Sequence, residues 1–133
     1  EGFVTALLAA VILLIATVTP PAPGWSAAEV EREIVAAAHS YGVPAAPLVE
    51  LARCETGGTF NPNLVGRAGE RGVFQWLPNP PGGLWEYTPA GRAGLSPRDV
   101  TLDIAMGAWA YAHGGDALMV QHWVACWQVA RGG

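Results

Sequence analysis

The chain has 133 residues and a formal net charge of −4 at neutral pH, which allows one domain and excludes a strongly basic surface. It contains no lysine, and its 7 basic residues are scattered arginines, so the basic stripe that nucleic-acid binding needs is absent. The 2 cysteines and 3 histidines lack the spacing of a zinc site, and no phosphate-cradling glycine loop occurs. We therefore expect no metal, no cofactor and no nucleic-acid partner.

The N-terminal segment is an uncharged, largely apolar run from residue 2 to residue 19. As a helix it would span about 27 Å, close to the hydrocarbon thickness of a bilayer. We predict a transmembrane anchor over residues 1–19, and a secretory signal, cleaved or uncleaved, is the alternative. Either interpretation places the rest of the chain outside the cytoplasm, anchored in the cell envelope or associated with a virion.

Residues 20–25 form a proline-rich linker, and residues 26–133 form the predicted domain. A helix is predicted over residues 26–41, because Ser26 and Glu29 have the spacing of a capping box and Gly42 can end the helix. Its apolar residues at helical spacing predict one buried face: Val30, Ile34, Ala37, Ala38 and Tyr41.

The rest of the domain is predicted as three helices and one irregular lobe. A second helix covers about residues 48–55, and residues 56–97 are rich in glycine, proline and aromatic residues. That segment is too long for an idle loop, so it is expected to be a functional lobe of turns or short strands. A helix opens at residues 96–97 and stops at the glycines after residue 113, and a last helix spans about 116–129. The predicted fold class is mainly α, with an irregular central lobe.

The 2 cysteines, Cys54 and Cys126, lie far apart in the sequence. Outside the cytoplasm such a pair favours a disulfide over two buried thiols. Closing so long a loop is worth roughly 4 kcal/mol in the chain-entropy description.

Glu55 is the candidate catalytic residue, because it ends the second predicted helix directly before Gly57 and Gly58. Glycines let a backbone approach a bulky ligand, and an apolar environment would raise the pKa of Glu55 and keep it protonated. Flat surfaces suited to sugar rings are expected from four aromatic residues of the lobe: Phe74, Trp76, Trp85 and Tyr87. The alternative is that Glu55 only ends a helix at the surface and that the aromatic residues belong to the core.

This order of motifs resembles the lytic transglycosylases and goose-type lysozymes. Their pattern is a catalytic Glu in Glu-Ser-Gly-Gly, then Asn-Pro, then a glycine-rich segment ending in Gly-[Leu/Val]-[Met/Phe]-Gln. The matching residues here are Glu55-Thr56-Gly57-Gly58, Asn61-Pro62, Gly66, Gly69, Gly72-Val73-Phe74-Gln75 and Pro78. The resemblance covers about residues 26–127 and implies a lysozyme-like fold, with Glu55 as acid and base. It also implies that Thr56, Gly72 and Gln75 line the substrate cleft.

Two departures from the family pattern stand out. The Tyr-Asn-x-Gly signature near the end of many lytic transglycosylases is replaced by residues 122–127, and Asp103 stands where the family has Asn. Three other tryptophans at helical spacing are predicted to be core rather than sugar platforms: Trp109, Trp123 and Trp127.

The resemblance implies cleavage of the β-1,4 bond between N-acetylmuramic acid and N-acetylglucosamine in peptidoglycan. A second carboxylate, which a hydrolase needs, is not evident: Glu70 is expected to be a solvated loop charge, and Glu86 to lie at the cleft rim. We therefore expect a lytic transglycosylase that leaves 1,6-anhydromuramic ends. The competing hypothesis is a non-catalytic lysozyme-like subunit that binds glycan within a membrane or virion assembly.

Overall fold

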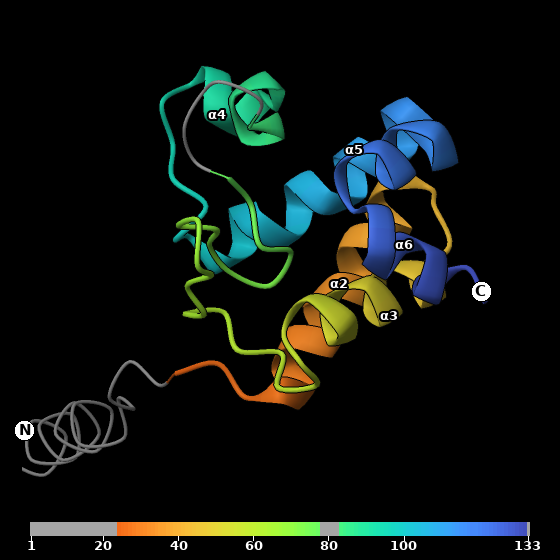
Figure 1. Cartoon of the computed structure of the whole chain (residues 1–133), viewed down its shortest axis with the longest axis horizontal. Helices are drawn as coiled ribbons and strands as arrows, with labels where there is room; N and C mark the ends of the chain where they lie inside the picture. Colours follow the sequence, from red (N-terminus) through yellow and green to blue (C-terminus); the bar gives the residue numbers. More distant parts are fainter. Residues whose placement is uncertain (1–23, 78–82, 133) are drawn as a thin grey trace, which may run out of the picture.

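The computed structural model describes residues 24–77 and 83–132, and the described chain is mainly helical, as predicted (Figure 1). The elements are α2 (Ala27–Tyr41), α3 (Ala45–Glu55), η1 (Leu84–Tyr87), α4 (Pro89–Arg92), α5 (Val100–His122) and α6 (Val124–Ala130). The predicted anchor over residues 1–19 and most of the linker lie outside the described residues. Within the described ranges, no helix has the length and apolarity to cross a bilayer.

The helices divide into two groups joined by α5. In Figure 1, α2, α3 and α6 lie together, η1 and α4 lie at the other end of the molecule, and α5 runs between the groups. Helix α6 packs against α3, and α5 packs against α2. The main core lies among these four helices.

Helix α2 begins and ends as its sequence predicts. The side chain of Ser26 accepts a hydrogen bond from the Glu29 N–H, and the Glu29 carboxylate accepts one from the Ser26 N–H. Gly42 ends the helix in the left-handed conformation that glycine adopts without strain. Of the predicted core face, Val30, Ile34 and Ala38 are buried.

Helix α3 starts three residues earlier than predicted, at Ala45 instead of Leu48. Pro44 occupies the N-cap, and Pro47 falls in the first turn, where a helix needs no N–H donor. The two prolines therefore lie at the start of the helix. The buried face consists of Pro47, Leu48, Leu51 and Ala52.

The central lobe is irregular, as predicted, but it contains short helices that were not predicted. Two isolated β-bridges join Val65 to Arg71 and Arg71 to Trp76. Thr88 caps α4 by accepting a hydrogen bond from the Gly91 N–H, and Pro89 follows as the first helical residue.

Helix α5 begins at Val100 because Asp99, rather than Ser96, is its N-cap and accepts from the Leu102 N–H. The predicted break appears at Gly115, whose φ of 61° and ψ of −165° are not helical. The predicted last helix is in fact divided again at Trp123, whose indole N–H donates to the Phe74 carbonyl oxygen at 2.7 Å. Trp123 itself has a non-helical backbone, with φ of −120° and ψ of 55°.

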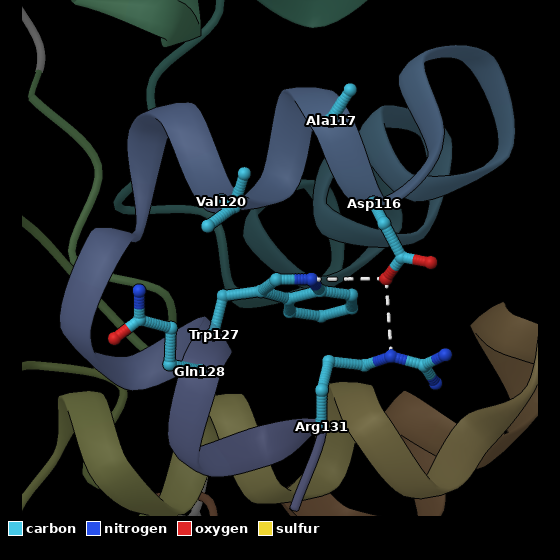
Figure 2. A pocket seen from close by; sticks show the side chains of 6 residues that line it. All are labelled: Asp116, Ala117, Val120, Trp127, Gln128 and Arg131. Carbon is cyan, nitrogen blue, oxygen red and sulfur yellow. Dashed lines mark hydrogen bonds and ion pairs between the residues drawn. The ribbon is translucent and has the colours of Figure 1, made fainter. Parts of the chain in front are cut away.

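Two links hold α6 in place. The predicted disulfide is confirmed: Cys54 of α3 is bonded to Cys126 of α6, with Cα atoms 5.6 Å apart. On another face of α6, the Asp116 carboxylate accepts from the Trp127 indole at 3.1 Å and pairs with Arg131 at 3.1 Å (Figure 2). These contacts tie α6 to α3 and to the second half of α5.

Candidate functional site

Glu55 is the last residue of α3, and the chain turns sharply away after it. Gly57 and Gly58 both have positive φ, so the turn that follows the carboxylate depends on glycine. The Glu55 side chain is partly buried, and this burial raises its pKa to about 7, with a further contribution from the negative charge of Glu70. Glu55 can therefore hold a proton near neutral pH, as a general acid must.

Glu70 was expected to be a solvated loop charge, and its partly exposed side chain makes a local contact within its own loop. Its Oε2 atom accepts a hydrogen bond from the Ala68 N–H at 3.2 Å, and its carbonyl oxygen accepts from the Gly66 N–H at 2.8 Å. A Cβ atom at Gly66 would collide with this carboxylate. Glu55 is therefore not isolated from other carboxylates, because the charge of Glu70 acts on it.

Thr56 was expected to line the substrate cleft, but its hydroxyl is not free. Its side chain is 3% exposed, and its hydroxyl donates to the Ala52 carbonyl oxygen at 2.8 Å. The Thr56 hydroxyl oxygen in turn accepts a hydrogen bond from the Phe60 N–H at 2.8 Å. Thr56 thus fixes the turn after Glu55 and has no substrate-facing group in this conformation.

Asp103 of α5 holds the loop of residues 72–76. It is fully buried, and its carboxylate accepts from the N–H groups of Val73 at 2.6 Å and Phe74 at 3.4 Å and from the Trp76 indole at 2.8 Å. Burial raises the pKa of Asp103 to about 7, although these three donors act in the opposite direction. A side chain at Gly72 would collide with the Asp103 carboxylate, so the absence of a side chain there lets the carboxylate approach the loop.

Gln75 is the polar side chain that this loop carries next to Glu70. Its backbone has a positive φ of 51°, unusual for a residue with a side chain. Its Nε2 donates to the carbonyl oxygens of Gly72 at 2.8 Å and Leu64 at 3.1 Å, which fixes the amide orientation. Both the Gln75 Oε1 and the Glu70 carboxylate border the space above Gly66, so the loop brings these two groups together.

Three of the four expected sugar platforms are core residues. Phe74, Trp76 and Trp85 are 0%, 1% and 3% exposed, and Trp76 makes edge-to-face contacts with Trp85 and Trp123. Their rings cannot meet a sugar face in this conformation. Tyr87, by contrast, is 62% exposed, so its ring is accessible to a ligand.

Two neighbouring hollows form a groove beside Gln75. The smaller, about 40 Å³, is lined by Gln75, Trp76, Leu77, Leu84, His122 and Trp123. The larger, about 550 Å³, is lined by Leu84, Tyr87, Arg92, Trp109, His113, Gly114, Leu118, Gln121 and His122. Because both include Leu84 and His122, we treat them as one groove, the Gln75–Trp109 groove. Burial lowers the pKa of His122, which favours its neutral form.

Sequence reasoning missed the roles of Asp103 and His122. The replacement of Asn by Asp at position 103 was the signal for the first, but only the fold brings Asp103 under the loop. His122 follows the break of α5 at Gly115, and the direction of its side chain after that break cannot be predicted from the sequence. Trp109 was predicted to be core; it packs against the core but also lines the groove.

In the described ranges, no group of three or more His, Cys, Asp or Glu side chains is placed to hold a metal ion. No family model matches the chain, and neither the curated proteins nor the solved structures contain a significant match.

Proposed function

We propose that this chain cleaves the β-1,4 bond between N-acetylmuramic acid and N-acetylglucosamine in peptidoglycan, as a lytic transglycosylase with Glu55 as its acid. The supporting observation is a partly buried carboxyl group with a pKa of about 7, placed at a glycine turn and close enough to Glu70 for the charge of Glu70 to act on it. The proposal also includes a lysozyme-like helical fold and an extracytoplasmic location.

In the proposed reaction, protonated Glu55 donates its proton to the glycosidic oxygen as the bond to the anomeric carbon of muramic acid breaks. The resulting carboxylate then removes the proton of the C6 hydroxyl of the same sugar. The C6 oxygen bonds to the anomeric carbon and closes an anhydro ring. One carboxyl group performs both transfers, and no water is consumed.

Glu70 supports the first step electrostatically, because its negative charge disfavours ionisation of Glu55. The same carboxylate is the residue that could activate water instead. Inverting hydrolases place a second carboxylate about 6.5–9.5 Å from the acid for this purpose. The products therefore distinguish the two pathways, and the anhydro product is the one we propose.

The Gln75–Trp109 groove supports the choice of an extended sugar polymer as substrate. It starts beside the loop that carries Glu70 and Gln75, and it ends at Trp109, Tyr87 and Arg92. An exposed tyrosine ring and a half-buried tryptophan give apolar faces, while the amide and imidazole groups can bind hydroxyls.

The test compares wild type, Glu55→Gln and Glu86→Gln on purified peptidoglycan. We expect Glu55→Gln to abolish release of soluble fragments, because the amide cannot donate an acidic proton, while its circular dichroism spectrum is unchanged. Glu86 is exposed on η1, so Glu86→Gln is the matched control and should keep wild-type activity. A Glu55→Gln variant with a tenth of wild-type activity would rule out this assignment. Binding of glycan without cleavage by wild type would favour a non-catalytic subunit.

A further inference from the structure

A second hollow lies on the loop side of α5 and has a different chemistry from the groove. It measures about 250 Å³ and is lined by Pro62, Asn63, Leu64, Arg71, Gly72 and Arg98. Its two charged lining residues are both arginines, and no carboxylate lines it. We call it the Arg71–Arg98 hollow.

Both arginines project from ordered backbone. The N–H of Arg71 donates to the Trp76 carbonyl oxygen at 2.8 Å, and the Trp76 N–H donates back to the Arg71 carbonyl oxygen at 2.9 Å. Arg98 lies next to the N-cap of α5, and its N–H donates to the Ser96 hydroxyl at 3.1 Å. The two side chains that line the hollow therefore begin from backbone that hydrogen bonds hold in place.

Neither arginine is neutralised within the described chain. The arginines that form ion pairs there are Arg53, with Glu31 and Glu50, and Arg131, with Asp116. Two guanidinium groups that share one hollow repel each other, and an anion between them removes that repulsion. Guanidinium also matches the planar or tetrahedral oxygens of carboxylates and phosphates by paired hydrogen bonds.

We propose that the Arg71–Arg98 hollow binds an oxyanion group, a carboxylate or a phosphate, carried by a wall polymer. Its position supports this assignment, because Leu64 and Gly72 line the hollow and their carbonyl oxygens also hold the Gln75 amide. The anion site is therefore next to the groove. The wall-polymer part rests on the proposed function: the carboxylate would come from a peptide stem, and the phosphate from a phosphate-bearing polymer.

The test measures binding to the full chain, with no cleavage step, so it is independent of the proposed reaction. Two probes are titrated in parallel, acetyl-alanyl-glutamate and inorganic phosphate, and binding is followed by isothermal calorimetry. We expect one probe to bind with a dissociation constant of about 1 mM or below and Arg71→Gln and Arg98→Gln each to weaken it about fivefold. Arg71→Lys keeps the charge and should weaken binding less.

Arg32→Gln is the matched control, because it removes the same charge from α2, outside the hollow. Preference for the dipeptide supports a peptide-stem carboxylate, and preference for phosphate supports a phosphate-bearing polymer. Binding of neither probe at about 10 mM, or equal loss in Arg32→Gln, would overturn the proposal. Retained binding with no glycan cleavage by wild type would leave the anion site intact and refute the proposed function alone.

Discussion

The acid role proposed for Glu55 depends on the surroundings of its carboxyl group. Partial burial at the end of α3 raises its pKa to about 7, and Glu70 adds to the shift. Both effects stabilise the protonated form, which is the form that donates to a leaving oxygen. The activity should therefore be lost as the pH rises through about 7.

Removing the charge of Glu70 should change that pH dependence. In Glu70→Gln, the pKa of Glu55 should fall because only the burial effect remains, and the alkaline limb of the rate profile should move down by about half a pH unit. The profile of kcat/KM against pH measures this shift. An unchanged alkaline limb would mean that the two carboxylates do not interact.

Glu55 should also affect stability in a pH-dependent way. Its pKa is higher in the folded than in the unfolded chain, so its contribution to stability is fully present below about pH 4.5 and is lost as the pH rises through about 7. Glu55→Gln lacks this loss. The variant should therefore gain about 1–2 kcal/mol over wild type between pH 4 and pH 8, after allowance for solvent screening of a partly exposed group. Urea unfolding of both proteins at pH 4 and pH 8 measures this difference in the free energy of unfolding. A difference of equal size at both pH values would contradict a raised pKa of Glu55.

At the scale of elements, Asp103 connects α5 to the loop of residues 72–76. Asp103→Ala leaves the Val73 and Phe74 N–H groups and the Trp76 indole without their acceptor. The free energy of unfolding should fall by about 3 kcal/mol or more, because each buried donor left unpaired costs about 1–3 kcal/mol. Urea denaturation measures the loss. Asp99→Ala, which removes only an exposed cap, should cost about 1 kcal/mol, and equal losses in the two variants would contradict the role of Asp103.

The helices could be predicted from sequence where local signals decide them. The capping box and Gly42 define α2 because they act within one turn of the chain. The start of α3 was misplaced because a proline inside the first turn looks the same in sequence as a proline before a helix. The division at Trp123 could not be predicted, because no glycine or proline marks it and the contact made there is with Phe74, 49 residues away in the sequence.

The site was predictable only in part, for a related reason. The order of motifs predicted Glu55 and Gln75 as site residues, and both remain candidates. The burial of the aromatic rings could not be predicted. In a glycine-rich segment, the sequence pattern around a buried tryptophan is the same as that around a tryptophan that binds sugar. Trp123 packs on Phe74 and Trp76, and Trp76 packs on Trp85, so the burial of these rings is a tertiary effect.

At the scale of the whole molecule, the Cys54–Cys126 disulfide joins the helix that carries Glu55 to α6. Reduction should lower the free energy of unfolding by up to about 4 kcal/mol, since the bond closes a long loop. Thermal unfolding with and without reductant measures the change. The Cys54→Ser, Cys126→Ser double variant should match the reduced wild type and ignore reductant, whereas an oxidised wild type no more stable than this variant would contradict the role of the bond.

The chemical form of the cleaved sugar distinguishes the proposed reaction from hydrolysis. The direct measurement is mass analysis of the fragments that wild type releases from purified peptidoglycan in ¹⁸O-labelled water. We predict muramic-acid ends that are lighter by one water and carry no ¹⁸O, and no such fragments from Glu55→Gln. Fragments with ¹⁸O-labelled reducing ends would contradict the anhydro mechanism and assign the activation of water to a second carboxylate, with Glu70 as the first residue to test.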